Sequence, residues 1–467
     1  MAKVLSKSGI DFTEGKLLKK FILFAIPIIL ANLLQQFFNT ADAIVIGKFA
    51  SPESLGAVSA SAPVINLIIN SVVGLSVGAN VVVAQAIGRR NNDGANKAVH
   101  SSMLFSLIVG VVIGLVGYLI AGSLTKLLGV DEVLQQKNTT YLGVYFLGTP
   151  AVLVYNFGAS VLRAKGDSKR PLYFLLLSGV VNVGLNLLFV IVFKMDVLGV
   201  ALATVISQVV SAVLVVICML KETDCTKLEI KKLRFHKKEI LSMLATGVPS
   251  MLNGVIFSVS NLIIHVAVNT ISATATIGNG IAANVENFTY LAMHAIYITT
   301  LSVVSQNYGA NNFPRIKKTM GIGVIVVTFV GVIMGGVSFL LRDQLCQIFT
   351  NADTTVEIIE FAKMRMTYIL LTYSTCGIQE IFVAGNRGLG QSTLSTVLSL
   401  ILACGVRIIW IYAIYKVFQL DYLLFIIYPI TWTLLIIGQG ILFAIMFKKL
   451  KKRAENQKRL VLTDQTK

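Results

Sequence analysis

Residues 54–88 read SLGAVSASAPVINLIINSVVGLSVGANVVVAQAIG and contain no Asp, Glu, Lys or Arg. An α-helix crosses the apolar core of a bilayer with about 20 residues, so this stretch is long enough for one span and its flanks. The stretch 240–285 is equally free of charged residues. A soluble helical bundle would show a polar stripe along each helix, and neither stretch shows one. The pattern predicts membrane-spanning helices.

The rest of the chain has the same character. Of its 467 residues, 55% are hydrophobic and 13% are charged, whereas soluble domains carry about 25% charged residues. We predict an all-α membrane protein with twelve transmembrane helices. The predicted spans are 18–46, 55–86, 98–124, 139–161, 171–193, 197–220, 241–269, 279–307, 319–341, 364–386, 392–415 and 422–447.

The chain is strongly basic, with 40 Lys and Arg against 22 Asp and Glu. Basic patches bind phosphate, which raises the possibility of a nucleic-acid partner. Here the basic residues lie mainly in the termini and in alternate short loops, the distribution that marks the cytoplasmic side of membrane proteins. We therefore expect both termini to be cytoplasmic and no nucleic acid to bind. Arg407 is the one basic residue that we expect to lie inside a span.

The chain divides near its midpoint. The stretch 221–239, KETDCTKLEIKKLRFHKKE, is its most charged part. It is predicted to be a cytoplasmic linker with a short amphipathic helix on the membrane surface. The linker separates an N-terminal lobe of six spans, 1–220, from a C-terminal lobe of six spans, 240–447. A basic cytoplasmic tail follows at 448–467.

The two lobes share short motifs in the same order. Pro27 and Pro249 lie in the first span of each lobe. Further along, AQAIGRRNNDGANKAV corresponds to SQNYGANNFPRIKK, and VLRAKGDSKRP corresponds to GNRGLGQST. The members of each pair are separated by nearly the same number of residues. Since each lobe has six spans, both enter the membrane from the same side. We predict two pseudo-symmetric lobes with a binding cavity between them.

These motifs resemble those of the multidrug and toxic compound extrusion (MATE) transporters, and most closely those of the bacterial branch. The resemblance covers roughly residues 15–450. It is carried by the spacing of Pro27 and Asp42, by LRAKGDSKRP and by ALATVISQ in the sixth span. It implies an antiporter in the bacterial cytoplasmic membrane that exports organic, mainly cationic compounds in exchange for Na⁺ or H⁺. We expect a monomer in the lipid bilayer, with no cofactor other than the coupling ion.

Asp42 is the first candidate for ion coupling. A carboxylate inside a span costs about 2.5–3.5 kcal/mol, and Asp42, Glu286 and Glu380 are the three acidic residues that the assignment puts there. A buried Asp can exchange a proton for Na⁺, because desolvation raises its pKa and a bound cation lowers it. The resemblance implies that Asp42 has this role. The alternative is an Asp that reaches the membrane interface from the end of its helix.

The resemblance also implies partners for Asp42. The family has an Asn followed four residues later by an Asp in the fifth span, where this chain has Asn182 and Asn186, and Thr204 of the sixth span joins the cluster. A spacing of four puts both Asn side chains on one helical face. One negative charge instead of two leaves Na⁺ and H⁺ both open as coupling ion. The alternative is that these polar side chains only bond helices together.

Four further residues are candidate substrate contacts. Glu286 is expected to contact a cationic substrate, or else to anchor a helix end at the interface. Glu380 and Asn156 occupy corresponding positions in the two lobes, and Glu380 either faces the cavity or pairs with Arg407. Gln35 lies on the first span with Pro27, which can bend that span. The predicted substrate-binding set is Gln35, Asn156, Glu286 and Glu380.

Other classes of function fit less well. The chain has no HExxH, GxSxG or GxxxxGK[ST] motif, so we expect no enzyme activity and no metal apart from Na⁺ at the coupling site. A flippase for lipid-linked oligosaccharides is the alternative transporter. Its pyrophosphate-bearing substrate calls for several Arg or Lys residues in the cavity, and we expect Arg407 alone there.

Overall fold

The computed structural model describes residues 9–348 and 355–465, all of whose regular structure is helical. The first half contains α1 (Leu17–Phe49), α2 (Pro52–Gly88), α3 (Asn92–Leu127), α4 (Glu132–Leu147), α5 (Thr149–Ala164), α6 (Lys169–Asn186), the π-helix η1 (Leu187–Val192) and α7 (Asp196–Leu220). The second half contains η2 (Ile230–Lys232), α8 (Lys237–Asn269), α9 (Ala273–Gly309), α10 (Phe313–Leu340), α11 (Arg342–Ile348), α12 (Val356–Leu370), α13 (Tyr373–Gly388), α14 (Ser392–Ser399), η3 (Leu400–Gly405), α15 (Val406–Trp410), η4 (Ile411–Tyr415), α16 (Lys416–Phe418) and α17 (Leu423–Gln465).

The membrane class and the two-lobed, twelve-span architecture are confirmed. Within the described residues, ten helices are long and apolar enough to cross a membrane, and α4 with α5, bent by 43°, forms an eleventh span. The more polar pair α12 and α13 occupies the position of the predicted tenth span, 364–386. The predicted tenth span, 364–386, begins too late, because α12 starts at Val356. Arg365 lies inside the predicted span as well as inside α12, which corrects the expectation that Arg407 is the one basic residue within a span.

The chain forms two compact units. Unit 1 holds the described residues up to Asp11 together with Ile26–Met251, and unit 2 holds Phe12–Ala25 and the described residues from Leu252 onward. Both α1 and α8 thus change unit within their length, next to Pro27 and Pro249 respectively. Each proline removes a backbone donor from the helix in which it lies. In each half of the chain, the first part of the first helix therefore belongs to the other unit: residues 17–25 of α1 belong to unit 2, and residues 237–251 of α8 belong to unit 1.

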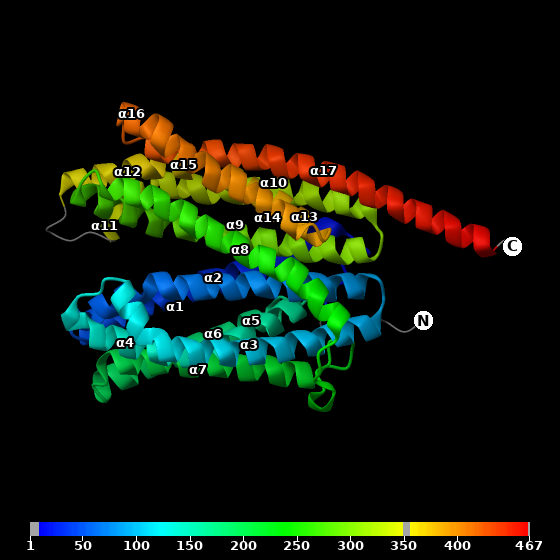
Figure 1. Ribbon diagram of the computed structural model, residues 1–467, viewed down its shortest axis with the longest axis horizontal. Helices are drawn as coiled ribbons and strands as arrows, with labels where there is room; N and C mark the ends of the chain where they lie inside the picture. The colour runs from blue at the N-terminus through cyan, green and yellow to red at the C-terminus, as the bar shows by residue number, and fades with distance from the viewer. Residues whose placement is uncertain (1–8, 349–354, 466–467) are drawn as a thin grey trace. The chain divides into compact units, whose positions relative to one another are not determined.

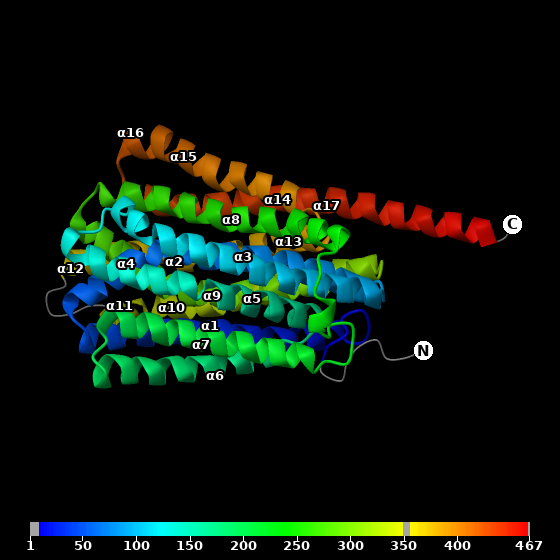
Figure 2. The ribbon, with the colours of Figure 1, turned by 60° about the horizontal axis from the view of Figure 1, so that its bottom comes forward.

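Small residues bring the helices of unit 1 together. Gly74 and Gly78 of α2 lie against the backbone of α8 at Met251 and Met243, so that a side chain at either glycine would collide with it. Such close approach is typical of helix pairs in membranes. Helices α6 and α7 lie side by side in both views of the ribbon (Figures 1 and 2). The buried core of the unit draws on α2, α3, α5 and α7.

The linker 221–236 differs from its prediction. It contains only the three-residue 3₁₀-helix η2 and no amphipathic helix. Its backbone is instead bonded to α3: Glu229 N–H donates to His100 Nε2 at 3.0 Å, and His236 N–H donates to Ser101 Oγ at 3.0 Å. These bonds satisfy backbone N–H groups that would otherwise be satisfied by the internal hydrogen bonds of a helix. The predicted tail from 448 continues α17, and its residues 466–467 lie outside the described range.

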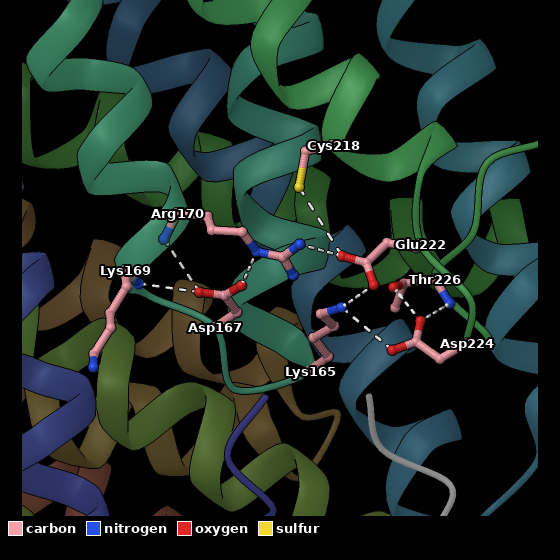
Figure 3. A network of polar contacts seen from close by, with 8 residues as sticks. All are labelled: Lys165, Asp167, Lys169, Arg170, Cys218, Glu222, Asp224 and Thr226. Atoms are coloured by element: carbon pink, nitrogen blue, oxygen red, sulfur yellow. Dashed lines mark hydrogen bonds and ion pairs between the residues drawn. The ribbon is translucent and has the colours of Figure 1, made fainter. Parts of the chain in front are cut away.

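Charged side chains hold together one end of unit 1. Lys165, which is 1% exposed, pairs with Glu222 at 2.7 Å and with Asp224 at 3.3 Å. Arg170 pairs with Glu222 at 2.5 Å and with Asp167. Figure 3 shows these groups converging from the loop after α5, the first turn of α6 and the linker after α7. The LRAKGDSKRP motif therefore has a structural role, since its charges fix the linker to the bundle.

Candidate ion-coupling site

Asp42 and the two asparagines meet inside unit 1. Asn186 donates from Nδ2 to Asp42 Oδ1 at 2.6 Å, and the same Nδ2 lies 3.4 Å from Asn182 Oδ1. Asn182 and Asn186 are buried, with 5% and 0% exposure, and Asp42 is half-buried. The predicted spacing on α6 thus puts both amides on the face that meets α1. The alternative, in which Asp42 only reaches the membrane interface from the end of its helix, does not explain this contact.

Packing accounts for the approach of α1 to α6. One turn before Asp42 on α1, the ring of Phe38 occupies the space where a side chain at Gly179 would lie. Glycine at this position therefore lets the two helices come close, one turn before Asn182. Directly after Asp42 and Asn186 in sequence, the chain enters a buried apolar cluster of α1, α4, η1 and α7, namely Val45, Ile46, Tyr141, Val190, Val197, Val200 and Ala201.

The cluster has the chemistry of a site for a small hard cation or a proton. Asn186 Oδ1 is buried and has no hydrogen-bond partner. Together with the Asp42 carboxylate and Asn182 Oδ1, it makes a set of oxygen atoms with one negative charge. Hard cations are held by carboxylate and carbonyl oxygens. A buried acceptor without a partner is costly, so these residues fit Na⁺, and the carboxylate alone fits a proton.

The backbone changes directly after this cluster. The α-helical hydrogen-bond pattern of α6 ends at Asn186, and the π-helix η1 begins at Leu187. In the second half, the π-helix η4 begins at Ile411, in the span that corresponds to α6 and η1. Short π-helical turns occur frequently at functional sites, where they shift the side chains on either side. The sequence contained no signal that identified these turns.

Thr204, Gln35 and Asn156 are not drawn into the cluster by any hydrogen bond that the structure describes. Thr204 lies on α7, and its carbonyl accepts from Ser207 Oγ at 2.8 Å. Gln35 is exposed on α1. Asn156 donates to the carbonyl of Val152 on its own helix at 2.8 Å. Pro27 lies within α1 at the point where the chain passes between units. The roles expected of these four residues stay predictions.

In unit 2, Glu286 forms a buried ion pair that the sequence did not reveal. Arg365 donates to both of its carboxylate oxygens, from Nε at 3.0 Å and from Nη2 at 2.7 Å, and to Asn279 Oδ1 from Nη1 at 2.5 Å. Glu286 is 4% exposed and Arg365 is 5% exposed. Glu286 is therefore held by a side chain of its own unit, and its depth in the membrane stays a prediction. A cationic substrate would have to compete with Arg365 for this carboxylate.

Glu380 has partners other than the one considered from sequence. Tyr290 donates to its Oε1 at 3.2 Å, and His294 Nδ1 lies 3.3 Å from its Oε2. The ring of His294 stacks between those of Tyr290 and Tyr297. Arg407 instead donates to Asn261 and Thr431. The Glu380–Arg407 ion bridge is wrong, because the two side chains join separate polar clusters.

Known proteins resemble this chain along most of its length. The family model described as MatE matches residues 27–188 and again 249–413. The "probable multidrug resistance protein YoeA" of Bacillus subtilis is 24% identical over 393 residues, which are 83% of this chain and 84% of that protein. The "multidrug export protein MepA" of Staphylococcus aureus strain NCTC 8325 is 22% identical over 84% of this chain and 86% of its own length.

A solved structure shows the same fold. It is described as the "outward-facing conformation of a multidrug resistance MATE family transporter of the MOP superfamily". It has a TM-score of 0.90 and 21% identity, and the match covers 96% of this chain and 100% of that one. The family model matches each half separately, in agreement with the repeat, and the two matches together span well over half of the residues. The chain therefore belongs to the MatE family.

Proposed function

We propose that this protein is a secondary antiporter that exports organic, mainly cationic, drugs or toxins in exchange for Na⁺ or H⁺. The bond between Asn186 and Asp42 carries the proposal, because it joins one half-buried carboxylate to two buried amides inside spans. The names of the bacterial relatives support drug export as the activity. The basic loops support a location in the bacterial cytoplasmic membrane with both termini cytoplasmic.

The site performs exchange through the charge of Asp42. In a span, an ionised carboxylate is costly unless a cation, a proton or a hydrogen-bond donor neutralises it. The side-chain N–H group of Asn186 donates to the ionised carboxylate and stabilises it in part. The oxygen atom of the same side-chain amide has no hydrogen-bond partner and can bind a cation. Release of the ion on one side of the membrane leaves the charge uncompensated. The ion-bound and ion-free states therefore differ in free energy. This difference biases the protein toward one or the other of two conformations, as alternating access requires.

A flippase for lipid-linked oligosaccharides is the competing function. Its substrate carries a pyrophosphate, which several Arg or Lys residues would have to bind. The structure describes three buried arginines in unit 2, namely Arg365, Arg387 and Arg407. Arg365 is already neutralised by Glu286. Arg387 lies in the last turn of α13, where it donates to the hydroxyl group of Tyr297. Arg407 is thus the one of the three that lies well inside a span without a counter-charge, and one guanidinium is a poor match for a pyrophosphate. Drug export is the better supported of the two.

Transport by purified protein in liposomes tests the proposal. A fluorescent cationic dye would be loaded on one side, and a Na⁺ gradient or a pH gradient would be imposed separately, with no ATP present. Dye movement against its concentration gradient with either ion supports an antiporter, and the effective gradient identifies the ion. Absence of movement with both gradients, from protein shown to be folded by gel filtration, would contradict the proposal.

A further inference from the structure

Arg407 is a fully buried guanidinium within unit 2. It lies on α15, inside the span formed by Ser392–Phe418, and is 1% exposed. Its Nη1 donates to Asn261 Oδ1 of α8 at 2.8 Å, and its Nη2 lies 3.4 Å from Thr431 Oγ1 of α17. The ring of Tyr428, also on α17, lies 4.3 Å from the guanidinium carbon. All these partners are neutral.

The positive charge of Arg407 lacks a counter-charge. Among the described residues, no carboxylate lies within ion-pair distance of it, and its Nε is buried with no hydrogen-bond partner. Arg365, buried to the same degree, has the carboxylate of Glu286. Arginine does not lose its proton in proteins, so burial cannot be relieved by neutralisation. An uncompensated charge in a span is costly and marks a functional site by default.

The geometry of the guanidinium matches one kind of ligand. Nε and Nη2 form the edge that binds a carboxylate with two parallel hydrogen bonds. In Arg407 this edge has an unpaired Nε, and Nη2 makes only the long contact with Thr431. The cation–π contact with Tyr428 stabilises the charge but leaves the N–H groups of this edge unused. The unused donors therefore call for a carboxylate.

Two further features indicate that a ligand can reach Arg407. Asn261, which bonds Nη1, is exposed on α8, so the guanidinium lies one side chain below the surface of unit 2. An exposed amide inside a span is itself unusual, because lipid offers it no hydrogen-bond partner. In addition, α15 is only five residues long and lies between the π-helices η3 and η4. Irregular helical turns of this kind concentrate at functional sites.

We propose that Arg407, with Asn261 and Thr431, binds a carboxylate group of a transported compound. This inference rests on the proposed export function and assigns a specificity-determining residue to it: Arg407 favours zwitterionic compounds, which carry an organic cation and a carboxylate, over purely cationic ones. A purely cationic compound gains nothing from Arg407 and is repelled by it. A zwitterion gains a charge-assisted pair that replaces the missing counter-charge.

A matched pair of dyes tests the site. Rhodamine 110 carries a free carboxyl group, and rhodamine 123 is its methyl ester and therefore a cation. Transport of each dye into liposomes would be measured for the wild type, for Arg407→Gln and for Lys416→Gln. Lys416 is an exposed basic residue whose ammonium group lies over the ring of Tyr412. We expect Arg407→Gln to lower the ratio of rhodamine 110 to rhodamine 123 transport by about tenfold, and Lys416→Gln to leave it unchanged.

A second variant covers the case in which Arg407→Gln does not fold. Asn261→Asp puts a carboxylate opposite Nη1 at an exposed position, so it supplies the counter-charge from the protein itself. It should lower the same ratio by competing for the guanidinium. An unchanged ratio in Asn261→Asp, or in folded Arg407→Gln, overturns the inference. Wild-type transport of rhodamine 123 without rhodamine 110 also overturns it, whereas failure of both dyes contradicts the proposed function instead.

Discussion

Asn186 donates a hydrogen bond of 2.6 Å to the carboxylate of Asp42 across 144 positions of sequence, and so joins the second part of α1 to the end of α6. The bond places a half-buried negative charge next to an amide oxygen that has no partner of its own. The occupant of this site must neutralise Asp42 without requiring further charge from the protein. The first two predictions follow from this arrangement.

Removing the charge of Asp42 should abolish export while leaving the fold intact. Asp42→Asn keeps the size of the side chain and can still accept from Asn186. It can no longer alternate between ion-bound and ion-free states, so dye transport by liposomes should fall to background. Asp93→Asn, which changes an exposed carboxylate paired with Lys97, is the control and should retain full transport. Normal transport by Asp42→Asn would refute the role of this residue.

Adding a second charge should change the ion dependence. Asn186→Asp creates two carboxylates where the structure has a 2.6 Å hydrogen bond, so one of them must bind a proton or a cation. We expect the pH at which transport is half-maximal to rise, and the response to Na⁺ to change. Asn92→Asp introduces a charge at an exposed position at the start of α3, outside the candidate sites, and serves as the comparison. Identical pH profiles for the wild type and Asn186→Asp would count against a shared site.

The sequence predicted the membrane class because uncharged stretches such as 54–88 have no other stable environment. It predicted the contact of Asp42 with Asn182 and Asn186 only through the family resemblance, since no local pattern connects the first span to the fifth. Arg365 was missed although the predicted span 364–386 contains it, because a basic residue at the second position of a predicted span resembles one in a flanking loop, and the helix in fact starts at Val356. The partners of Arg407 were also missed, because Asn261 lies 146 positions away and the contact depends on how each helix is rotated. Hydrophobic periodicity predicts neither the partner of a residue that is distant in sequence nor the rotation of a helix about its own axis.

Breaking the Glu286–Arg365 pair should destabilise unit 2. Glu286→Gln leaves a buried guanidinium without its counter-charge, which costs about 3–5 kcal/mol. The double change Glu286→Leu with Arg365→Met removes both charges and should recover most of this loss. Thermal unfolding of the detergent-solubilised protein measures the effect. If Glu286→Gln unfolds at the wild-type temperature yet loses transport of cationic dyes alone, then a direct substrate contact is the better account of this residue.

The charge network in Figure 3 should make stability depend on acid pH. Burial alone would raise the pKa of Asp224, but hydrogen bonds from Thr226 and the charge of Lys165 outweigh burial and lower this pKa below its ordinary value of 3.8. The folded state therefore binds a proton at Asp224 less readily than the unfolded state does. Stability from this group is complete above the ordinary value and is lost as the pH falls through the lowered one.

Asp224→Asn tests this dependence. It should reduce the free energy of unfolding by about 1 kcal/mol at pH 7. The difference from the wild type should persist down to about pH 5 and then shrink in more acidic solution, as Asp224 of the wild type also becomes neutral. Chemical denaturation in detergent at a series of pH values measures it. Asp93→Asn is the control, because its exposed ion pair is worth little. A difference that grows on acidification would contradict the lowered pKa of Asp224, because it would mean that the folded state binds this proton more readily than the unfolded state does.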